Sequence, residues 1–154
     1  MSASTTGRFS HVLCWVDGSD EACRAADRAA NLAQQIEAKL SFVAVGDVPE
    51  SDTGFAEYAR IEGLSEPMSP VIPGSVRFCL DQAMSIAGKA GLKEATRLVR
   101  VGDPVAAICD AARLQDADLV VIRKQRSNLV EKLIGESIAD KLSRRCEFAV
   151  MLVG

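Results

Sequence analysis

Short, almost continuous apolar runs constrain this chain more than any other feature. They recur along the sequence, each followed by a polar break, at His11–Val16, Leu40–Val45, Arg97–Val101, Leu119–Ile122 and Phe148–Val153. Unbroken apolar runs of this length are typical of strands buried on both faces of a parallel sheet. The segments between them carry helix signals. This alternation predicts an α/β fold with an open, five-stranded parallel sheet and helices on both faces.

The helix signals are strongest after the first and third runs. Ser19 can cap a helix with Asp20 and Glu21 in its first turn, and small apolar residues follow at helical spacing. Asp103 and Pro104 form a second helix start, with aspartate as the N-cap and proline at the first helical position. A further helix is expected over Ser75–Lys89, and another after the loop Arg123–Asn128, with Ile134, Ile138 and Leu142 on its apolar face.

Length and charge narrow the function. The 154 residues suffice for one domain, which we place at 10–154, after a loose tail at 1–9; residues 46–74 form a long, irregular connection. The net charge of −3 gives no field that would draw the protein to nucleic acid or an anionic membrane. The N-terminus lacks the apolar core of a signal peptide, and no run is long enough to cross a bilayer. We therefore expect a cytoplasmic protein.

The cysteines and the single histidine offer little chemistry. The five cysteines are scattered, and none form a CxxC pair, so a zinc or thioredoxin-like site is not expected. Reduced, mostly buried thiols are the simplest interpretation. The only histidine, His11, begins a strand and is expected to be structural. Without a GxGxxG, Walker A or GxSxG motif, no metal site and no catalytic constellation is recognisable, and an enzymatic role stays open but unsupported.

The loop after Leu119–Ile122 is the strongest candidate site. It holds Arg123, Lys124 and Arg126, and it lies where an α/β fold places ligands, beyond the carboxyl end of a strand. One interpretation is a solvated loop whose charges pair with one another. The other is an anion site, because guanidinium groups suit phosphate oxygens.

Several segments together resemble the universal stress protein family. They are VLCWVDGSDEA, LSFVAV, VGDPVAAICDAA, ADLVVI and GESIADKLSRRCEFAVMLV. The resemblance implies a Rossmann-like sheet of strand order 3-2-1-4-5 and a non-catalytic, dimeric stress-response or regulatory protein. It also implies a homodimer formed by antiparallel pairing of the last strand, whose residues are Ala149, Val150, Met151, Leu152 and Val153. An unknown protein partner is a further expectation.

Family members that bind ATP share a pattern of Gly, two residues, Gly, nine residues and Gly-Ser or Gly-Thr. Laid on this chain without gaps, the pattern falls on Arg123, Arg126, Glu136 and Ser137, so only the serine is kept. Glycines there let backbone N–H groups approach phosphate, whereas arginine side chains occupy the space that the phosphates need. The carboxylate of Glu136 would repel phosphate. Glu136 could also pair with an arginine and seal the cleft. The sequence therefore predicts that family-type ATP binding is lost.

Other positions of the family's nucleotide cleft also have counterparts. The resemblance places Asp17 at the adenine, Val45 and Ile122 beside the base, and Gln125 near the phosphates. Trp15, where the family has a small residue or proline, could fill the space of the adenine, although simple core packing also explains it. We therefore expect no cofactor. The alternative is a sensor that binds ATP or another adenine nucleotide with Mg²⁺, or an anion, through Arg123 and Arg126.

Overall fold

The sheet has five parallel strands. The computed structural model describes residues 8–46, 74–92, 94–124 and 137–154. The strands lie side by side in the order β3-β2-β1-β4-β5, and every pairing is parallel. Their bounds are β1 His11–Trp15, β2 Lys39–Gly46, β3 Ala95–Val101, β4 Leu119–Arg123 and β5 Ala149–Val153. The predicted fold class and strand order are confirmed.

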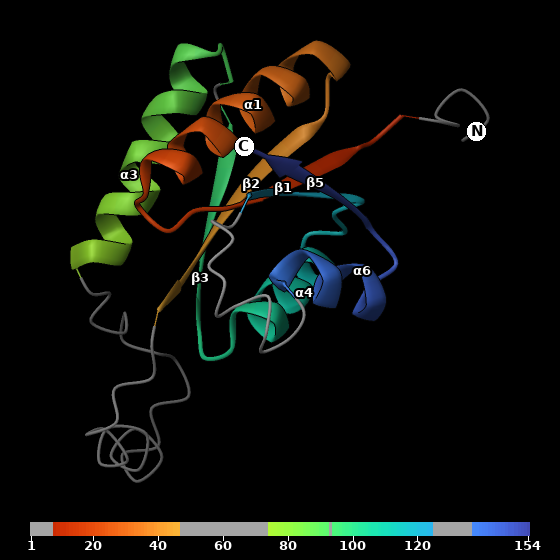
Figure 1. Cartoon of the computed structure of the whole chain (residues 1–154). Helices are drawn as coiled ribbons and strands as arrows, with labels where there is room; N and C mark the ends of the chain where they lie inside the picture. Colours follow the sequence, from red (N-terminus) through yellow and green to blue (C-terminus); the bar gives the residue numbers. More distant parts are fainter. Residues whose placement is uncertain (1–7, 47–73, 93, 125–136) are drawn as a thin grey trace, which may run out of the picture.

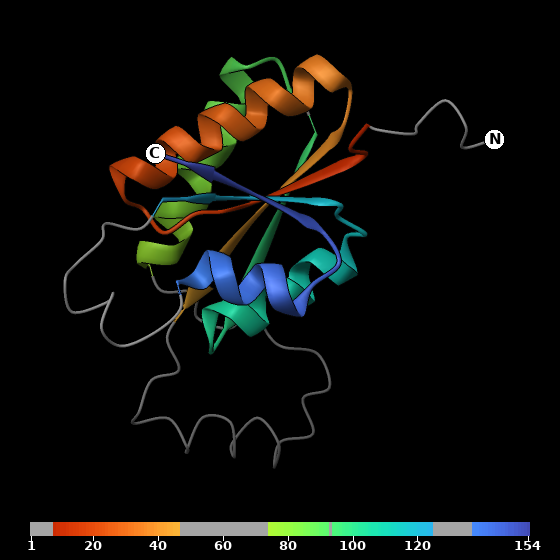
Figure 2. The same cartoon turned by 45° about the vertical axis from the view of Figure 1, so that its right-hand side comes forward.

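Helices cover both faces of the sheet (Figure 1). They are α1 Asp20–Ile36, α3 Gly74–Lys89, α4 Pro104–Leu114 and α6 Ile138–Arg145. Figure 2 shows α1 and α3 together on one face, and α4 and α6 together on the other. Among these helices and the rest of the described chain, none is long and apolar enough to cross a membrane.

The helix starts follow from their capping residues. Ser19 accepts a hydrogen bond from the Ala22 N–H at 3.0 Å and so begins α1. Asp103 accepts one from the Ala106 N–H at 3.0 Å, and Pro104 follows at the first helical position of α4. The buried face of α1 consists entirely of alanine, which lets the helix backbone lie close to the sheet.

The core has two layers because successive side chains of a strand point to opposite faces. In β1, Val12 and Cys14 face α1 and α3, whereas Leu13 and Trp15 face α4 and α6. Both layers are closed to solvent, as the buried sequence of β1 predicts. Ile122 belongs to the α4 layer and is 1% exposed.

The edge strand β5 differs from the centre of the sheet. It pairs with β4 on one side, and no described strand pairs with its other side. Ala149, Met151 and Leu152 are exposed, which is unusual for an apolar strand. Most of the predicted tail at 1–9 and the connection at 46–74 lie outside the described residues, although Phe9 packs against the core.

Candidate functional site

The candidate site lies where β1 and β4 end, side by side in the middle of the sheet. β1 has β2 on one side and β4 on the other, so the order of the strands reverses there. In open α/β sheets, ligands bind at such a switch point, beyond the carboxyl ends of the strands. Asp17 follows β1, and Arg123 is the last residue of β4. The topology thus brings together residues that are 106 positions apart.

An ion pair joins these two residues. Arg123 Nε donates to Asp17 Oδ2 at 2.6 Å, and the side chains are 22% and 26% exposed. Charge-assisted hydrogen bonds of this length are among the stronger polar contacts in proteins. The sequence left open a self-paired loop, a pair between Glu136 and Arg123 or Arg126, and an anion site. The structure places Arg123 instead across the cleft, on the carboxylate that the resemblance assigns to adenine.

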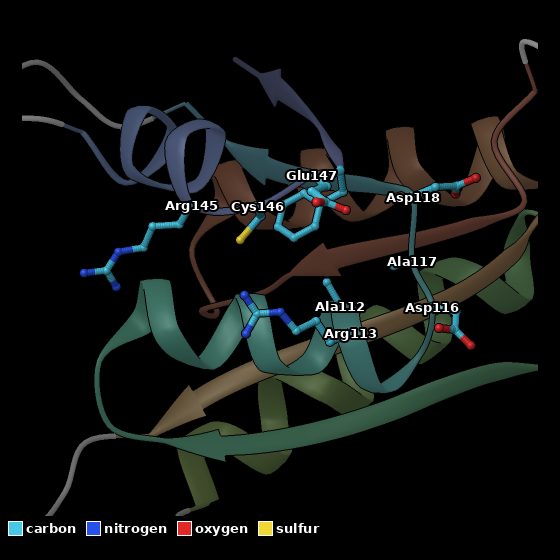
Figure 3. Close-up of a pocket in the computed structure, with 9 residues that line it drawn as sticks. Ala112, Arg113, Asp116, Ala117, Asp118, Arg145, Cys146 and Glu147 are labelled. Carbon is cyan, nitrogen blue, oxygen red and sulfur yellow. The ribbon is translucent and has the colours of Figure 1, made fainter.

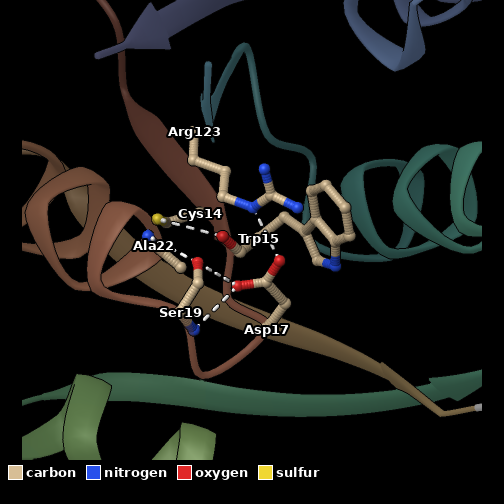
Figure 4. Close-up of polar contacts among 6 residues, drawn as sticks. All are labelled: Cys14, Trp15, Asp17, Ser19, Ala22 and Arg123. Atoms are coloured by element: carbon tan, nitrogen blue, oxygen red, sulfur yellow. Dashed lines mark hydrogen bonds and ion pairs between the residues drawn. The ribbon is translucent and has the colours of Figure 1, made fainter. Parts of the chain in front are cut away.

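The second oxygen of Asp17 is also occupied. Asp17 Oδ1 accepts hydrogen bonds from the Ser19 N–H at 3.0 Å and from the Ser19 hydroxyl at 2.6 Å (Figure 4). Gly18 makes this turn possible, because its φ of +84° is strained for other residues. Partial burial acts to raise the pKa of Asp17, but the hydrogen bonds from Ser19 and Arg123 outweigh it and hold the pKa below its ordinary value.

The indole ring of Trp15 lies against the guanidinium of Arg123. The guanidinium carbon of Arg123 lies 5.7 Å from the centre of the indole ring, within cation–π range. Trp15 is only 7% exposed and packs in the α4 layer of the core. Trp15 therefore both packs in the core and contacts Arg123. In Figure 4, Trp15, Asp17 and Arg123 form one compact group.

The other predicted site residues lie in the core, at the start of α6, or outside the described residues. Val45 is half-buried and packs, with Ile122, in the α4 layer. Ser137 caps α6: its hydroxyl accepts from the Asp140 N–H at 3.2 Å and lies 3.0 Å from Asp140 Oδ2. Gln125, Arg126 and Glu136 lie outside the described residues.

The expectation of five reduced cysteines is wrong. Cys109 of α4 and Cys146, directly after α6, form a disulfide on the face of the sheet that α4 and α6 cover. They are 37 positions apart, so no local spacing signals the pair. Cys14, Cys23 and Cys79 are free thiols, and burial raises the pKa of each above its ordinary value.

A further link between β1 and β4 escaped the sequence analysis. At the amino ends of the two strands, the Asp118 carboxylate accepts hydrogen bonds from the backbone N–H groups of Ser10 and His11, at 2.8 Å and 3.0 Å. The one available signal was that Asp118 directly precedes a buried strand. His11 Nε2 lies 2.7 Å from the Ser41 hydroxyl, in a buried contact away from the cleft. This contact agrees with a structural role for the histidine.

Within the described ranges, the side chains at the site suit binding. No cluster of three or more His, Cys, Asp or Glu side chains there could hold a metal ion. The chemistry of the site is that of a carboxylate, a guanidinium and an indole. These groups recognise bases and anions.

Comparison with known proteins identifies the family. The model of the universal stress protein family matches residues 8–154. The chain belongs to the universal stress protein family. It is 32% identical to the universal stress protein Rv1636 of Mycobacterium tuberculosis over 148 residues, which cover 94% of this chain and 96% of the relative. The universal stress protein YxiE of Bacillus subtilis is 28% identical over 94% of this chain and 99% of its own.

Solved universal stress proteins share the fold. One in complex with cAMP is 26% identical, with a TM-score of 0.69 and coverage of 95% of this chain and 97% of its own. UspA of Lactobacillus plantarum has a TM-score of 0.70 at 21% identity, and the match covers 96% of this chain and 99% of the other. The likeness thus extends over almost the whole chain in both cases.

Proposed function

We propose that this universal stress protein is a non-catalytic, dimeric regulatory protein of the cytoplasm that does not bind ATP in the family manner. One observation carries the proposal: both carboxylate oxygens of Asp17 are already engaged within the chain, by Arg123 and by Ser19. Three of the roughly four lone-pair sites of this carboxylate are thus in use, and an adenine amino group that approached Oδ2 would compete with the Arg123 guanidinium.

Arg123 opposes ATP in a second way. It stands where the family pattern has its first glycine, and its guanidinium lies over Trp15. A bound adenine would have to displace this guanidinium from both the carboxylate and the indole. A partly exposed ion pair contributes about 1 kcal/mol or less, so Arg123 alone lowers ATP affinity only moderately. The further loss is expected from Arg126 and Glu136, the other replaced glycines of the pattern.

Isothermal titration calorimetry with ATP and Mg²⁺ tests this proposal. We expect no saturable heat up to about 1 mM ATP, which corresponds to a binding free energy weaker than about −4 kcal/mol. The variant Arg123→Gly/Arg126→Gly/Glu136→Gly restores the glycines of the pattern and is expected to bind. Lys124→Gly is the matched control and should behave as the unaltered protein. Micromolar ATP binding by the unaltered protein would refute the proposal.

Dimer formation is proposed through the free edge of β5. Its backbone N–H and C=O groups face no described strand, and Leu152 is 50% exposed beside them. Antiparallel pairing of two copies would satisfy the backbone groups and cover Leu152 and Met151. Light scattering should report a dimer that Leu152→Glu converts to a monomer. Phe78→Glu is the control, because Phe78 on α3 is similarly exposed, at 58%. A dimer unaffected by Leu152→Glu would contradict this interface.

A second candidate function is a sensor of an adenine nucleotide with a single phosphate. The specific support is the cAMP complex of a universal stress protein that is 26% identical to this chain. Such a ligand does not need a glycine loop long enough for three phosphates. Arg123 could leave Asp17 for the phosphate, which would free the carboxylate for the base. Calorimetry with cAMP and AMP tests this, and Arg123→Gln should weaken binding at least about tenfold. Equal affinity in the variant would exclude that role of Arg123.

A further inference from the structure

A disulfide and a small apolar contact join α6 to α4. α6 is eight residues long, and Leu142 is its one fully buried side chain. Leu142 packs into the same layer as Ile108 and Cys109 of α4, and Ile138 and Ala139 of α6 are partly buried against that layer. The link from Cys109 to Cys146 adds a covalent anchor at the end of α6, three residues before β5 begins.

The two cysteines differ in burial. Cys109 is 4% exposed, whereas Cys146 is only partly buried. Cys146 also lines an open cavity of about 510 Å³, together with Arg113, Arg145 and Phe148. Figure 3 shows the Cys146 sulfur pointing between α6 and α4, above Arg113. A small thiol that enters this cavity meets the Cys146 residue at its wall.

We propose that Cys109 and Cys146 form a reversible redox modification site, which exchanges with small thiols and disulfides and controls how firmly α6 is held against α4. The disulfide state fixes α6, and the dithiol state loosens it. The inference does not depend on nucleotide binding. Cys14 is excluded as a partner because it is fully buried on the opposite face of the sheet.

The exchange is a balanced two-electron reaction. A glutathione thiolate attacks Cys146 Sγ, the bond between the cysteine sulfurs breaks, and Cys109 leaves as a thiolate that takes up a proton. A second glutathione thiolate attacks the glutathione sulfur of this mixed disulfide. Glutathione disulfide then leaves, and the Cys146 thiolate takes up a proton. Two glutathione molecules are oxidised as one protein disulfide is reduced, and glutathione disulfide reverses both steps.

The test uses the full chain in buffers of varied glutathione to glutathione disulfide ratio. Samples are quenched in acid, alkylated after denaturation and analysed by mass spectrometry, while hydrogen exchange is followed in parallel. We expect Cys109 and Cys146 to change together from disulfide to alkylated thiol while circular dichroism stays native. Amide exchange in α6 should become at least about fivefold faster in the reduced form, with α1 unchanged.

Two variants separate the switch from general loosening. Cys146→Ser changes a partly buried side chain and should show fast α6 exchange at every ratio. Cys23→Ala, at a half-buried free cysteine of α1, should respond like the unaltered protein. The proposal is overturned if the cysteines stay alkylatable at every ratio, if the disulfide is reduced only when the protein unfolds, or if α6 exchange does not change on reduction.

Discussion

An aspartate joins β1 to β4 at both ends of the two strands, but the two links are built differently. At the amino ends, Asp118 of the β4 side accepts from the backbone N–H groups of Ser10 and His11. At the carboxyl ends, Asp17 of the β1 side accepts from a side chain, that of Arg123. The first link uses donors that cannot leave while β1 stays in the sheet. The second uses a donor on a flexible stem.

We therefore assign a structural role to the link at Asp118, and we expect the link at Asp17 to bear on binding. A carboxylate held by the main-chain donors of a neighbouring strand's start stabilises the fold. A carboxylate held by an arginine side chain can be exchanged for a ligand at the cost of one partly exposed ion pair. The exchangeable link is also the one at the switch point of the sheet, where this fold class binds ligands. We therefore expect changes at the amino end to affect stability, and changes at the carboxyl end to affect binding.

The largest effect is expected for Asp118→Ala. This change leaves the Ser10 and His11 N–H groups without their partner and should lower the free energy of unfolding by about 2–3 kcal/mol. Urea denaturation measures the difference. Asp110→Ala is the control, because the Asp110 carboxylate is exposed and lies 3.8 Å from Arg113. It should cost less than about 0.5 kcal/mol. Equal losses in the two variants would show that the hydrogen bonds of Asp118 stabilise the fold no more than an exposed ion pair does.

The next effect is a dependence of stability on pH at the amino end. Burial, followed by the nearby charge of Lys39, lowers the pKa of His11 below its ordinary 6.5. Between pH 7 and 5 the unfolded chain therefore binds more protons than the folded one, so stability falls as the pH falls. The slope is at most about 1.4 kcal/mol per pH unit. His11→Gln removes the only histidine and should flatten the dependence of the free energy of unfolding on pH. An unchanged slope would show that other titrating groups cause the dependence.

The smallest effect on stability is expected at the carboxyl end. Arg123→Gln removes the ion pair with Asp17 and should lower the free energy of unfolding by about 0.5–1 kcal/mol. Salt at 1 M should reduce the difference between the variant and the unaltered protein, because it screens the partly exposed charges. A loss as large as that for Asp118→Ala would end the distinction between a structural link and an exchangeable one.

Sequence patterns were sufficient for the strands because each buried strand is an apolar run. The predicted runs at Leu40–Val45 and Leu119–Ile122 each differ from β2 and β4 by only a terminal residue or two. The strand order came from the family resemblance, and the pairings agree with it. Apolar patterning records burial, but it does not say which strands are neighbours.

The partners of charged and sulfur-containing side chains were not predictable in the same way. The sequence placed Asp17, Trp15 and Arg123 near one cleft, but it did not indicate that Arg123 would choose Asp17. An arginine with several acidic residues within reach pairs according to three-dimensional geometry, which no spacing encodes. The same holds for Cys109 and Cys146, which meet only because α4 and α6 pack on the same face of the sheet.

Trp15 makes the central claim directly measurable. It is the only tryptophan, and it lies beside the Arg123 guanidinium that pairs with Asp17. The measurement is a fluorescence titration of the unaltered protein with ATP and Mg²⁺, corrected for absorbance by the nucleotide. The ion pair together with the three replaced glycines predicts that Trp15 emission shows no saturable change up to about 1 mM ATP, the concentration that marks weak binding. A saturable change at micromolar ATP would contradict the proposal that family-type ATP binding is lost.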